Sequence, residues 1–308
     1  MNTFNTVATQ GKLTLGLVFP IESYTGSIAR MDNQEQLAQR AEALGFKALW
    51  FRDVPFNDPS FGDAGQLYDP WVYMTHIMNH TQHIALATSS IILPLRHPVH
   101  TAKSLLSLQY LSNGRVVLGV ASGDRPSEYP AFDRDSMQKG ELFRDSFAYV
   151  KALQGSFPRH ESAHYGTVEG SIDLLPKWAE HTPMLVTGHS GQSLDWIAEH
   201  ADGWLYYPRD FAFLQHNLQR WSASLEKAGQ GWKPYMQSLY VDLVEDRNAD
   251  PRGIHLGFRS GTEYLLAHLK ELERQGVNHV ILNLKYGSRP ADVVVEELGA
   301  GVVPAFGG

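Results

Sequence analysis

The sequence predicts an α/β protein whose strands close into a (β/α)8 barrel, the TIM-barrel architecture. Eight short apolar runs alternate with eight helix-like segments along the 308 residues. The runs are almost continuously apolar, which is typical of parallel strands that are buried on both faces. Eight strand–helix units in a chain of this length fit a closed barrel better than an open doubly wound sheet.

The strands are predicted at the apolar runs, residues 15–19, 48–51, 84–93, 116–120, 184–187, 201–207, 235–244 and 279–284. The helices are predicted at residues 33–44, from 70 onward, and at 98–111, 140–153, 191–200, 210–228, 261–275 and 290–298. Local signals set several boundaries: Pro70 suits a first helical turn, and Gly45 and Gly276 suit helix ends.

One connection is longer than barrel connections usually are. Residues 156–183 separate the fourth helix from the fifth strand, and we expect them to form an insertion. No Gly/Ser-rich or Pro-rich linker interrupts the chain. The sequence therefore predicts a single domain over residues 1–308.

Composition excludes several classes of function. The chain has 26 Lys and Arg against 33 Asp and Glu, a formal net charge of −7, with no long basic run, so no nucleic acid or membrane partner is expected. Cysteine is absent, which excludes disulfides, a thiolate nucleophile and Cys-ligated metals. The polar N-terminus has no signal-peptide pattern, and the apolar run 84–93 is too short to cross a bilayer, so we expect a cytoplasmic protein.

Polar residues gather directly after the predicted strands. In a (β/α)8 barrel the active site lies at the carboxyl ends of the strands. Asp53 follows the second strand, Arg96 and His97 follow the third, and Tyr206 ends the sixth. These positions are where a ligand site is expected. Asp53 and Asp124 could exchange protons if buried, although aspartates at strand ends are also common helix caps.

The turn after the fifth strand is the most informative segment. Gly188, Ser190, Gly191 and Ser193 stand at the start of a predicted helix, where small residues and backbone N–H groups suit an anion such as phosphate. The alternative is that Ser190 merely caps the helix, and the two are compatible. Gln192 replaces the last glycine of a Gly-x-Ser-x-Gly nucleophile elbow, which excludes that motif.

Two histidine pairs have a spacing that could hold a metal. His76 and His80, and His97 and His100, each share a helical face. No glutamate completes a His-Glu-x-x-His pattern around them, so we interpret these histidines as caps and surface residues and predict no metal site.

Together the strand ends resemble those of the luciferase-like flavin-dependent monooxygenases, whose fold is a (β/α)8 barrel that holds a reduced flavin. The resemblance covers residues 13–304. Its motifs are Ala-Leu-Trp at 48–50 with Asp53, residues 88–94 with His97 and Pro98, residues 112–115 and 118–123, residues 186–193, Ala-Asp-Gly at 201–203 and residues 276–280. Residues 51–55 and 122–126 resemble one bacterial subgroup of that family.

The resemblance implies FMN as the cofactor and assigns residues to it. Ser89 and Ser90 match the family's non-proline cis peptide under the flavin ring, and Ser190 and Ser193 match its phosphate-binding hydroxyls. Ser122 stands where luciferase has a phosphate-binding arginine, so Arg125 or Lys139 would supply that charge. The implied cofactor-binding residues are Thr88, Ser89, Ser90, Ser122, Arg125, Lys139, Gly188, Ser190, Gly191, Gln192 and Ser193.

The resemblance is incomplete at the catalytic base. Luciferase has a Glu-His pair after the second strand, whereas Asp53 and Val54 stand there in this chain. A histidine base therefore cannot be carried over, and Asp53, Arg96, His97 and Tyr206 are the candidates to contact substrate. Residues 245–260 are also fewer than in luciferase's mobile lid, so light emission with a long aldehyde is not expected.

We expect a monooxygenase that uses reduced FMN and O2 on a small organic substrate, with a separate flavin reductase and, by analogy, a homodimer. Hydride transfer with a deazaflavin cofactor is an alternative. The acidic tail of a deazaflavin is longer than that of FMN, however, and would be expected to need a larger number of basic residues than Arg125, Lys139 and Arg209. A non-enzymatic flavin carrier is another. A non-redox aldolase or hydrolase barrel is disfavoured because no paired carboxylates or Schiff-base lysine stand at the strand ends.

Overall fold

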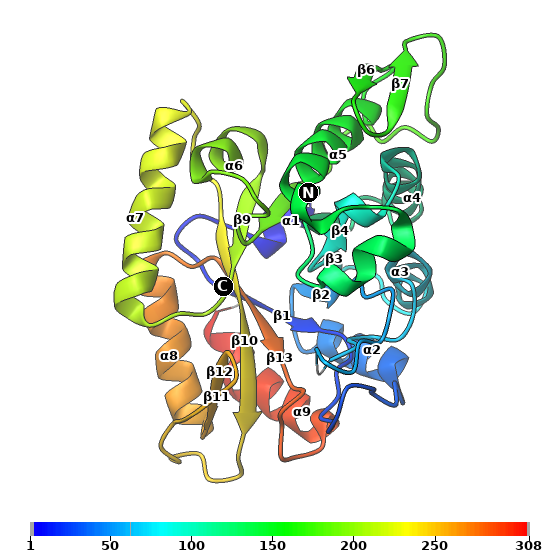
Figure 1. The fold of residues 1–308 in the computed structure, drawn as a ribbon. Coiled ribbons are helices and arrows are strands. Elements are labelled where there is room, and N and C mark those ends of the chain that lie inside the picture. The colour runs from blue at the N-terminus through cyan, green and yellow to red at the C-terminus, as the bar shows by residue number, and fades with distance from the viewer. Residues whose placement is uncertain (1–2, 62, 307–308) are drawn as a thin grey trace.

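A closed parallel barrel forms the centre of the computed structural model, which describes residues 3–61 and 63–306 (Figure 1). Within these residues the barrel has eight strands in the order β10-β13-β1-β2-β3-β5-β8-β9, and β9 pairs with β10 to close it. The strands are β1 (Thr14–Val18), β2 (Ala48–Phe51), β3 (Ala85–Thr88), β5 (Val116–Ala121), β8 (Met184–Thr187), β9 (Gly203–Tyr206), β10 (Tyr235–Leu243) and β13 (His279–Asn283). The predicted barrel is confirmed.

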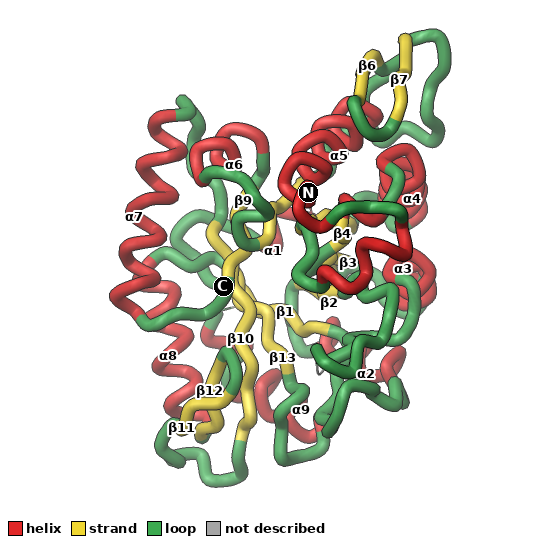
Figure 2. The backbone as a smooth tube through the Cα atoms, viewed as in Figure 1, coloured by secondary structure: helices red, strands yellow, loops and turns green. Residues whose placement is uncertain are grey.

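The helices form an outer layer around these strands, as Figure 2 shows. They are α2 (Gln34–Ala43), α3 (Pro70–Met78), α4 (Pro98–Leu111), α5 (Lys139–Leu153), α6 (Leu194–His200), α7 (Phe211–Lys227), α8 (Thr262–Gln275) and α9 (Ala291–Gly301). Each predicted helix is present, and most ends agree within one or two residues. None of the described helices is long and apolar enough to cross a membrane.

The predicted strand 84–93 is divided in the structure. β3 ends at Thr88, the Ser89–Ser90 peptide bond is cis, and the chain continues as β4 (Ile91–Ile92), which pairs with β5, and a short 3-10 turn, η1 (Leu93–Leu95). The cis bond is the one that the family resemblance implies. The apolar segment predicted as one strand thus forms strand β3, a break after Thr88, the short strand β4 and a buried 3-10 turn.

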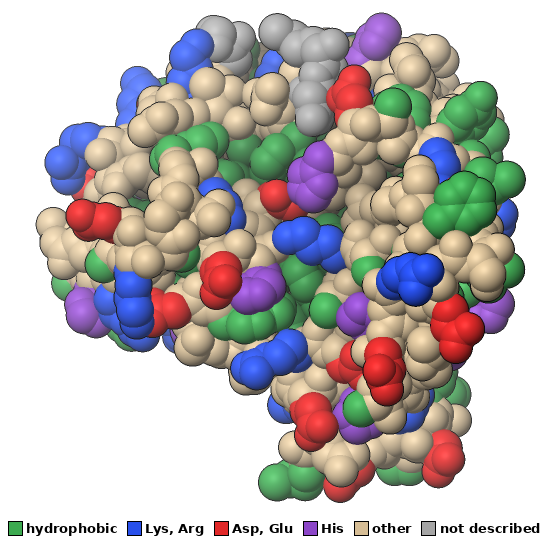
Figure 3. Space-filling model, turned by 90° about the horizontal axis from the view of Figure 1, so that it is seen from above, with side chains coloured by type: hydrophobic (Ala, Val, Ile, Leu, Met, Phe, Trp, Pro, Cys, Tyr) green, Lys and Arg blue, Asp and Glu red, His purple; other side chains and the backbone are tan. Residues whose placement is uncertain are grey.

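Several elements were not predicted from the sequence. They are α1 (Thr3–Val7), the strands β11 (Arg252–Ile254) and β12 (Gly257–Ser260), and the 3-10 turns η2 (Pro126–Phe132), η3 (Ser136–Gln138) and η4 (Val303–Ala305). The insertion is a hairpin of β6 (Arg159–Ser162) and β7 (Gly166–Glu169), which projects from the barrel beside α5 (Figure 1). Figure 3 shows basic and acidic side chains interspersed on the face seen from above.

A buried hydrogen-bond chain joins α1 to the barrel interior. The Trp50 indole N–H donates to His279 Nε2 at 2.9 Å, and the opposite ring nitrogen, Nδ1, lies 2.6 Å from Thr14 Oγ1. The Thr14 hydroxyl donates to the carbonyl of Val7 in α1. Because an indole can only donate, Nε2 must accept and Nδ1 carries the proton of a neutral imidazole. Burial lowers the pKa of His279 to about 3.

The first prediction concerns Gly119 in β5. A Cβ at this position would lie 1.9 Å from the carbonyl oxygen of Thr88 in β3, so Gly119→Ala should force the two strands apart. We expect a loss of about 3 kcal/mol or more in the free energy of unfolding, measured by urea denaturation. Gly231→Ala is the matched control, since no atom lies within 4 Å of its Cβ. Equal stability of the two variants would contradict the strand packing described.

The second prediction concerns pH. Below the ordinary histidine pKa of 6.5 the unfolded chain protonates position 279, whereas the folded chain stays neutral until about pH 3. The imidazole of His279 therefore has no effect on the free energy of unfolding above pH 6.5. Between pH 6.5 and about pH 3 it lowers that free energy by about 1.4 kcal/mol for each pH unit. We expect the free energy of unfolding of His279→Gln, measured by urea denaturation at a series of pH values, to change less with pH across the same window. An unchanged slope would refute the assignment.

Candidate functional site

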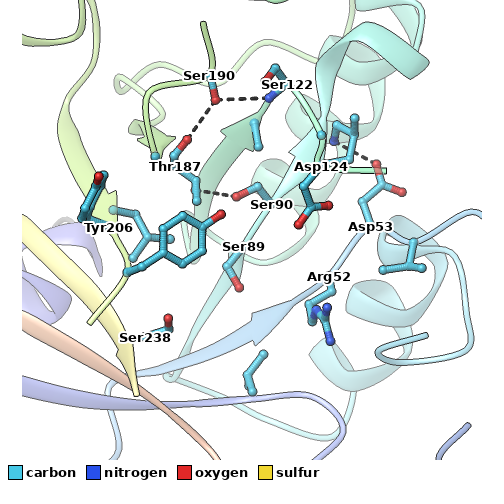
Figure 4. Close-up of a pocket in the computed structure, with 18 of the residues that line it drawn as sticks. Arg52, Asp53, Ser89, Ser90, Ser122, Asp124, Thr187, Ser190, Tyr206 and Ser238 are labelled. Carbon is cyan, nitrogen blue, oxygen red and sulfur yellow. Dashed lines mark hydrogen bonds between the residues drawn. The ribbon is translucent and has the colours of Figure 1, made fainter. Parts of the chain in front are cut away.

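A cavity of about 290 Å³ lies at the carboxyl ends of the barrel strands (Figure 4). Its walls come from the ends of β2, β3, β5, β8, β9, β10 and β13 and the loops that follow them. In Figure 4, Ser190 lies at one end beside Ser122 and Thr187, Arg52 lies towards the other end, and Ser89 and Ser90 lie between them. The volume is near the lower limit for small-molecule pockets, about 300–1,000 Å³.

About half of the site residues proposed from the sequence line this cavity. They are Asp53, Ser89, Ser90, Ser122, Arg125, Gly188, Ser190 and Tyr206. The residues outside its wall are Thr88, Arg96, His97, Lys139, Gly191, Gln192 and Ser193. Most of these residues outside the wall make hydrogen bonds to other parts of the protein, and these bonds explain where their side chains lie.

Asp53 is occupied by an ion pair. Its Oδ1 accepts from Arg96 Nη2 and its Oδ2 from Arg96 Nε, both at 2.7 Å, and Oδ2 also accepts from the Ile92 N–H at 3.0 Å. Arg96 Nη2 reaches Asp69 at 2.8 Å as well. Burial acts to lower the pKa of Arg96, but its bonds to Asp53 and Asp69 outweigh burial and raise it. Asp53 and Arg96 thus tie together the loops after β2 and β4.

His97 and Thr88 are structural in this arrangement. His97 is the N-cap of α4, where its Nδ1 accepts from the Val99 N–H at 3.3 Å, and its ring packs against Tyr165 of the insertion. Thr88 is fully buried and donates to the carbonyl of Gly119 at 2.7 Å. His97 thus lies outside the cavity wall, because its side chain, directly before Pro98, caps the start of α4.

The turn after β8 has the backbone of an anion site. Gly188, Ser190 and Gly191 all have positive φ, at 58°, 48° and 74°. The Gly188 N–H donates to Leu205, but among the described residues the N–H groups of His189, Ser190 and Gly191 have no hydrogen-bond acceptor. Successive free N–H groups in such a turn suit a phosphate. The residues present therefore fit the phosphate of a flavin mononucleotide.

Hydroxyl roles in this turn differ from the expectation. Ser193, not Ser190, caps α6, accepting from the Trp196 N–H at 3.2 Å. The Ser190 hydroxyl donates to the Thr187 carbonyl at 2.9 Å and accepts from the Ser122 N–H at 3.1 Å. The Ser193 hydroxyl proton is thus available for a ligand, while that of Ser190 already has a partner.

Four contacts hold the turn in place. The Gln192 amide donates to the carbonyl of Gly140 at 2.7 Å and its oxygen accepts from Arg144 at 2.8 Å. The Trp204 indole donates to the Gly188 carbonyl at 2.7 Å. Gly191 packs on Gly140 so closely that a Cβ on Gly191 would lie 2.6 Å from the Gly140 Cα. The Gln192 side chain is therefore a support of the turn, with both its ends in use.

The two basic candidates for the phosphate end have protein partners. Arg125 is buried, donates to the carbonyls of Phe56 and Asp63, and lies 4.4 Å over the Phe61 ring. Burial lowers its pKa. Lys139 Nζ lies 3.5 Å from the carbonyl of Gly123. Arg125 thus fastens the loop after β2 to the loop after β5.

Several cavity residues were missed by sequence reasoning, among them Arg52, Glu128, His189, Ser238, Tyr240 and Asn283. Glu128 in η2 is buried, its Oε1 has no hydrogen-bond partner, and burial raises its pKa. Burial also lowers the pKa of His189. Ser238 and Tyr240 had a usable signal, since they are polar positions two residues apart in a predicted apolar strand.

The third prediction tests the structural role of Asp53. Asp53→Asn removes the charge that faces Arg96, so we expect a loss of about 2–3 kcal/mol in the free energy of unfolding. Urea denaturation measures it, with the exposed Asp292→Asn as control, expected within about 0.5 kcal/mol of the unmodified protein. Unchanged stability of Asp53→Asn would show that the pair does not tie the loops.

Comparison with known proteins identifies the family of this chain. A sequence model of the luciferase-like monooxygenase family matches residues 13–249. An uncharacterised protein of Mycobacterium tuberculosis is 31% identical over 238 residues, covering 69% of this chain and 80% of that protein.

Two solved structures share the barrel. An F420-dependent secondary alcohol dehydrogenase has a TM-score of 0.78 at 16% identity, covering 96% of this chain and 99% of that one. The FMN complex of the oxygenating constituent of 3,6-diketocamphane monooxygenase from Pseudomonas putida has a TM-score of 0.74 at 14% identity, covering 95% and 98%. At such identities they establish a common fold alone. The family match over most of the chain is decisive, and the protein belongs to the luciferase-like monooxygenase family of oxidoreductases.

Proposed function

We propose that this protein is a flavin-dependent monooxygenase that uses reduced FMN and O2 to oxygenate a small organic substrate. The turn at residues 188–193 supports the proposal most strongly. It lies at one end of the cavity, and its free N–H groups are donors that a terminal phosphate can accept from. Bound reduced FMN would supply the electrons and the O2 chemistry. The protein's part is to hold the phosphate, orient the ring and exclude water.

Named residues perform these tasks. The N–H groups of His189, Ser190 and Gly191 and the hydroxyl of Ser193 would donate to the phosphate, and Lys139 would add positive charge nearby. Ser89 and Ser90, which line the cavity between its two ends, would contact the ring system. The side chains of Tyr206 and its neighbours on the barrel rim keep bulk water from the reacting centre.

Glu128 replaces Asp53 as our candidate for proton exchange. Both oxygens of Asp53 are bonded to Arg96, whereas Glu128 Oε1 has no hydrogen-bond partner in the described structure. Burial raises the pKa of Glu128, so its carboxyl keeps a proton to a higher pH than an exposed glutamate does. Glu128 lines the cavity and its Oε1 lies 3.9 Å from Arg125, and its carboxyl is the group that we propose exchanges a proton with the substrate.

FMN is favoured over a deazaflavin by the shortage of basic groups at the phosphate end. Arg125 is bonded to the loop after β2, and Lys139 lies against the Gly123 carbonyl. The longer acidic tail of F420 asks for more cationic partners than this. One solved relative binds F420, so the deazaflavin alternative is the direct competitor in any test.

The test is an anaerobic titration of the protein with reduced FMN and, separately, with reduced F420, followed by fluorescence. We expect FMN to bind more tightly and the complex to consume O2 when air is admitted. Failure to bind FMN in either redox state would end the proposal. Tighter binding of F420 with no O2 consumption would establish the hydride-transfer alternative instead.

The fourth prediction isolates the phosphate. Gly191→Ala places a Cβ 2.6 Å from the Gly140 Cα and must distort the turn. We expect its FMN dissociation constant to rise about tenfold, a cost of about 1.4 kcal/mol, while riboflavin, which lacks the phosphate, binds unchanged. Ser107→Ala in α4 is the control. If Gly191→Ala weakened the binding of FMN and of riboflavin equally, the result would contradict phosphate binding at this turn.

The proposal extends to location and partners. The protein would act in the cytoplasm and receive reduced FMN from a separate reductase. We also propose a homodimer. Size-exclusion chromatography with light scattering, and activity with and without an added flavin reductase, test these two statements directly.

A further inference from the structure

We propose that the end of the cavity opposite the phosphate turn binds an anionic oxyacid group of the substrate, a carboxylate or a sulfonate. The binding surface consists of Arg52, Ser238, Tyr240 and Asn283, which we call the donor wall. All four residues line the cavity. The inference rests on the proposed function in one respect, that the cofactor's phosphate takes the Ser190 end.

The barrel brings these residues together from three strand ends. Tyr240 in β10 is paired in register with Asn283 in β13. Ser238 stands two residues before Tyr240, and positions two apart in a strand share a face. Arg52 directly follows β2, and Figure 4 shows Ser238 and Arg52 on the side of the cavity away from Ser190. The donor wall thus combines neighbouring positions of β10 and β13 with Arg52, which follows β2 on the far side of β1.

Its donors are not used by the protein. The hydroxyls of Ser238 and Tyr240 make no hydrogen bond to any described residue, and Arg52 directs only Nη1 to Asp63, at 2.6 Å. The Asn283 side chain is 8% exposed, and its Oδ1 accepts from the Lys285 N–H at 3.0 Å. Because the oxygen must face that N–H, the amide Nδ2 is left for the cavity. A ligand here must therefore supply acceptors.

The charges of this end favour an anion. Asp63 is shared by Arg52 and by Lys285, whose Nζ lies 3.5 Å from Oδ1, and it also accepts from the Tyr24 hydroxyl at 2.6 Å. Burial opposes ionisation of Asp63, but Arg52 outweighs it and lowers the pKa to about 2. The partly buried Arg52 and the buried Lys285 thus both lie at the Asp63 carboxylate, beside the donor wall.

Three further carboxylates line the cavity, and two of them, Asp53 and Glu128, lie beside an arginine. Asp53 is paired with Arg96, and Glu128 lies 3.9 Å from Arg125. Asp124 is exposed and comes from the loop after β5 rather than from the donor wall. An anionic oxygen group placed on the donor wall would receive a charge-assisted bond from Arg52 and neutral bonds from Tyr240 and Asn283.

The experiment measures binding of three probes by isothermal titration calorimetry, benzoate, benzenesulfonate and the neutral benzamide, in the absence of cofactor. We expect one or both anions to bind at least about tenfold more tightly than benzamide. The tighter of the two anions identifies which oxyacid the donor wall prefers. Equal affinity for the anions and benzamide would overturn the inference.

Variants locate the anion. Tyr240→Phe and Asn283→Leu each remove one donor, and we expect the affinity for the preferred anion to fall about fivefold to tenfold with benzamide unaffected. Arg52→Lys should retain more affinity than Arg52→Gln. Tyr264→Phe in α8 is the matched control for the lost hydroxyl, and circular dichroism verifies folding. Anion affinity that is unchanged in both Tyr240→Phe and Asn283→Leu would overturn the donor wall.

The two proposals fail separately. We expect Gly191→Ala to bind the anion as the unmodified protein does, because the anion lies away from the phosphate turn. If Gly191→Ala loses anion binding while Tyr240→Phe retains it, the inference is overturned. A protein that binds FMN but no anion would refute the donor wall alone. One that binds the anion but no flavin would refute the proposed function alone.

Discussion

The backbones at Gly140 and Gly191 touch with no side chain between them, and the shape of the turn after β8 depends on this contact. The contact seats the start of α5 against the turn after β8, so the turn can take the left-handed backbone that points its N–H groups outward. Gln192 and Trp204 then fix its position from either side. A larger residue at either glycine would have to move one of the two loops that form the site.

The polar residues at the barrel rim divide into those that build the site and those that remain available to a ligand. Asp53, Arg96 and Asp69 satisfy one another, as Arg125 does with the carbonyls of the loop after β2. Buried charges of this kind are stable only when paired, so they define loop geometry. The groups without protein partners are then the informative ones, because a ligand can still bond to them.

These available groups are unevenly distributed along the cavity. Backbone N–H groups dominate at the turn after β8, and side-chain donors dominate on Tyr240 and Asn283. Both ends therefore suit acceptors, and the middle is the place for a flat ring system. A cavity with two acceptor-binding ends fits a phosphorylated cofactor together with an anionic substrate better than it fits one neutral ligand.

The sequence by itself determined the barrel architecture and predicted the turn after β8. Apolar runs and helix signals such as Pro70 and Gly276 are local, so the strands and helices could be predicted close to their observed ends. The motif at residues 186–193 is also contiguous, and the turn could be read from it. The short elements α1, β11 and β12 could not, because they form only by packing against a barrel that already exists.

Only the tertiary structure decided which polar side chains face the cavity. Arg96 and His97 adjoin a strand end in sequence, yet an ion pair and a helix cap turn them elsewhere. Arg52, Glu128 and Asn283 enter the site from three different loops and strands. These three residues stand 76, 155 and 231 positions apart in the sequence, and no local pattern predicts that such distant positions meet at one cavity.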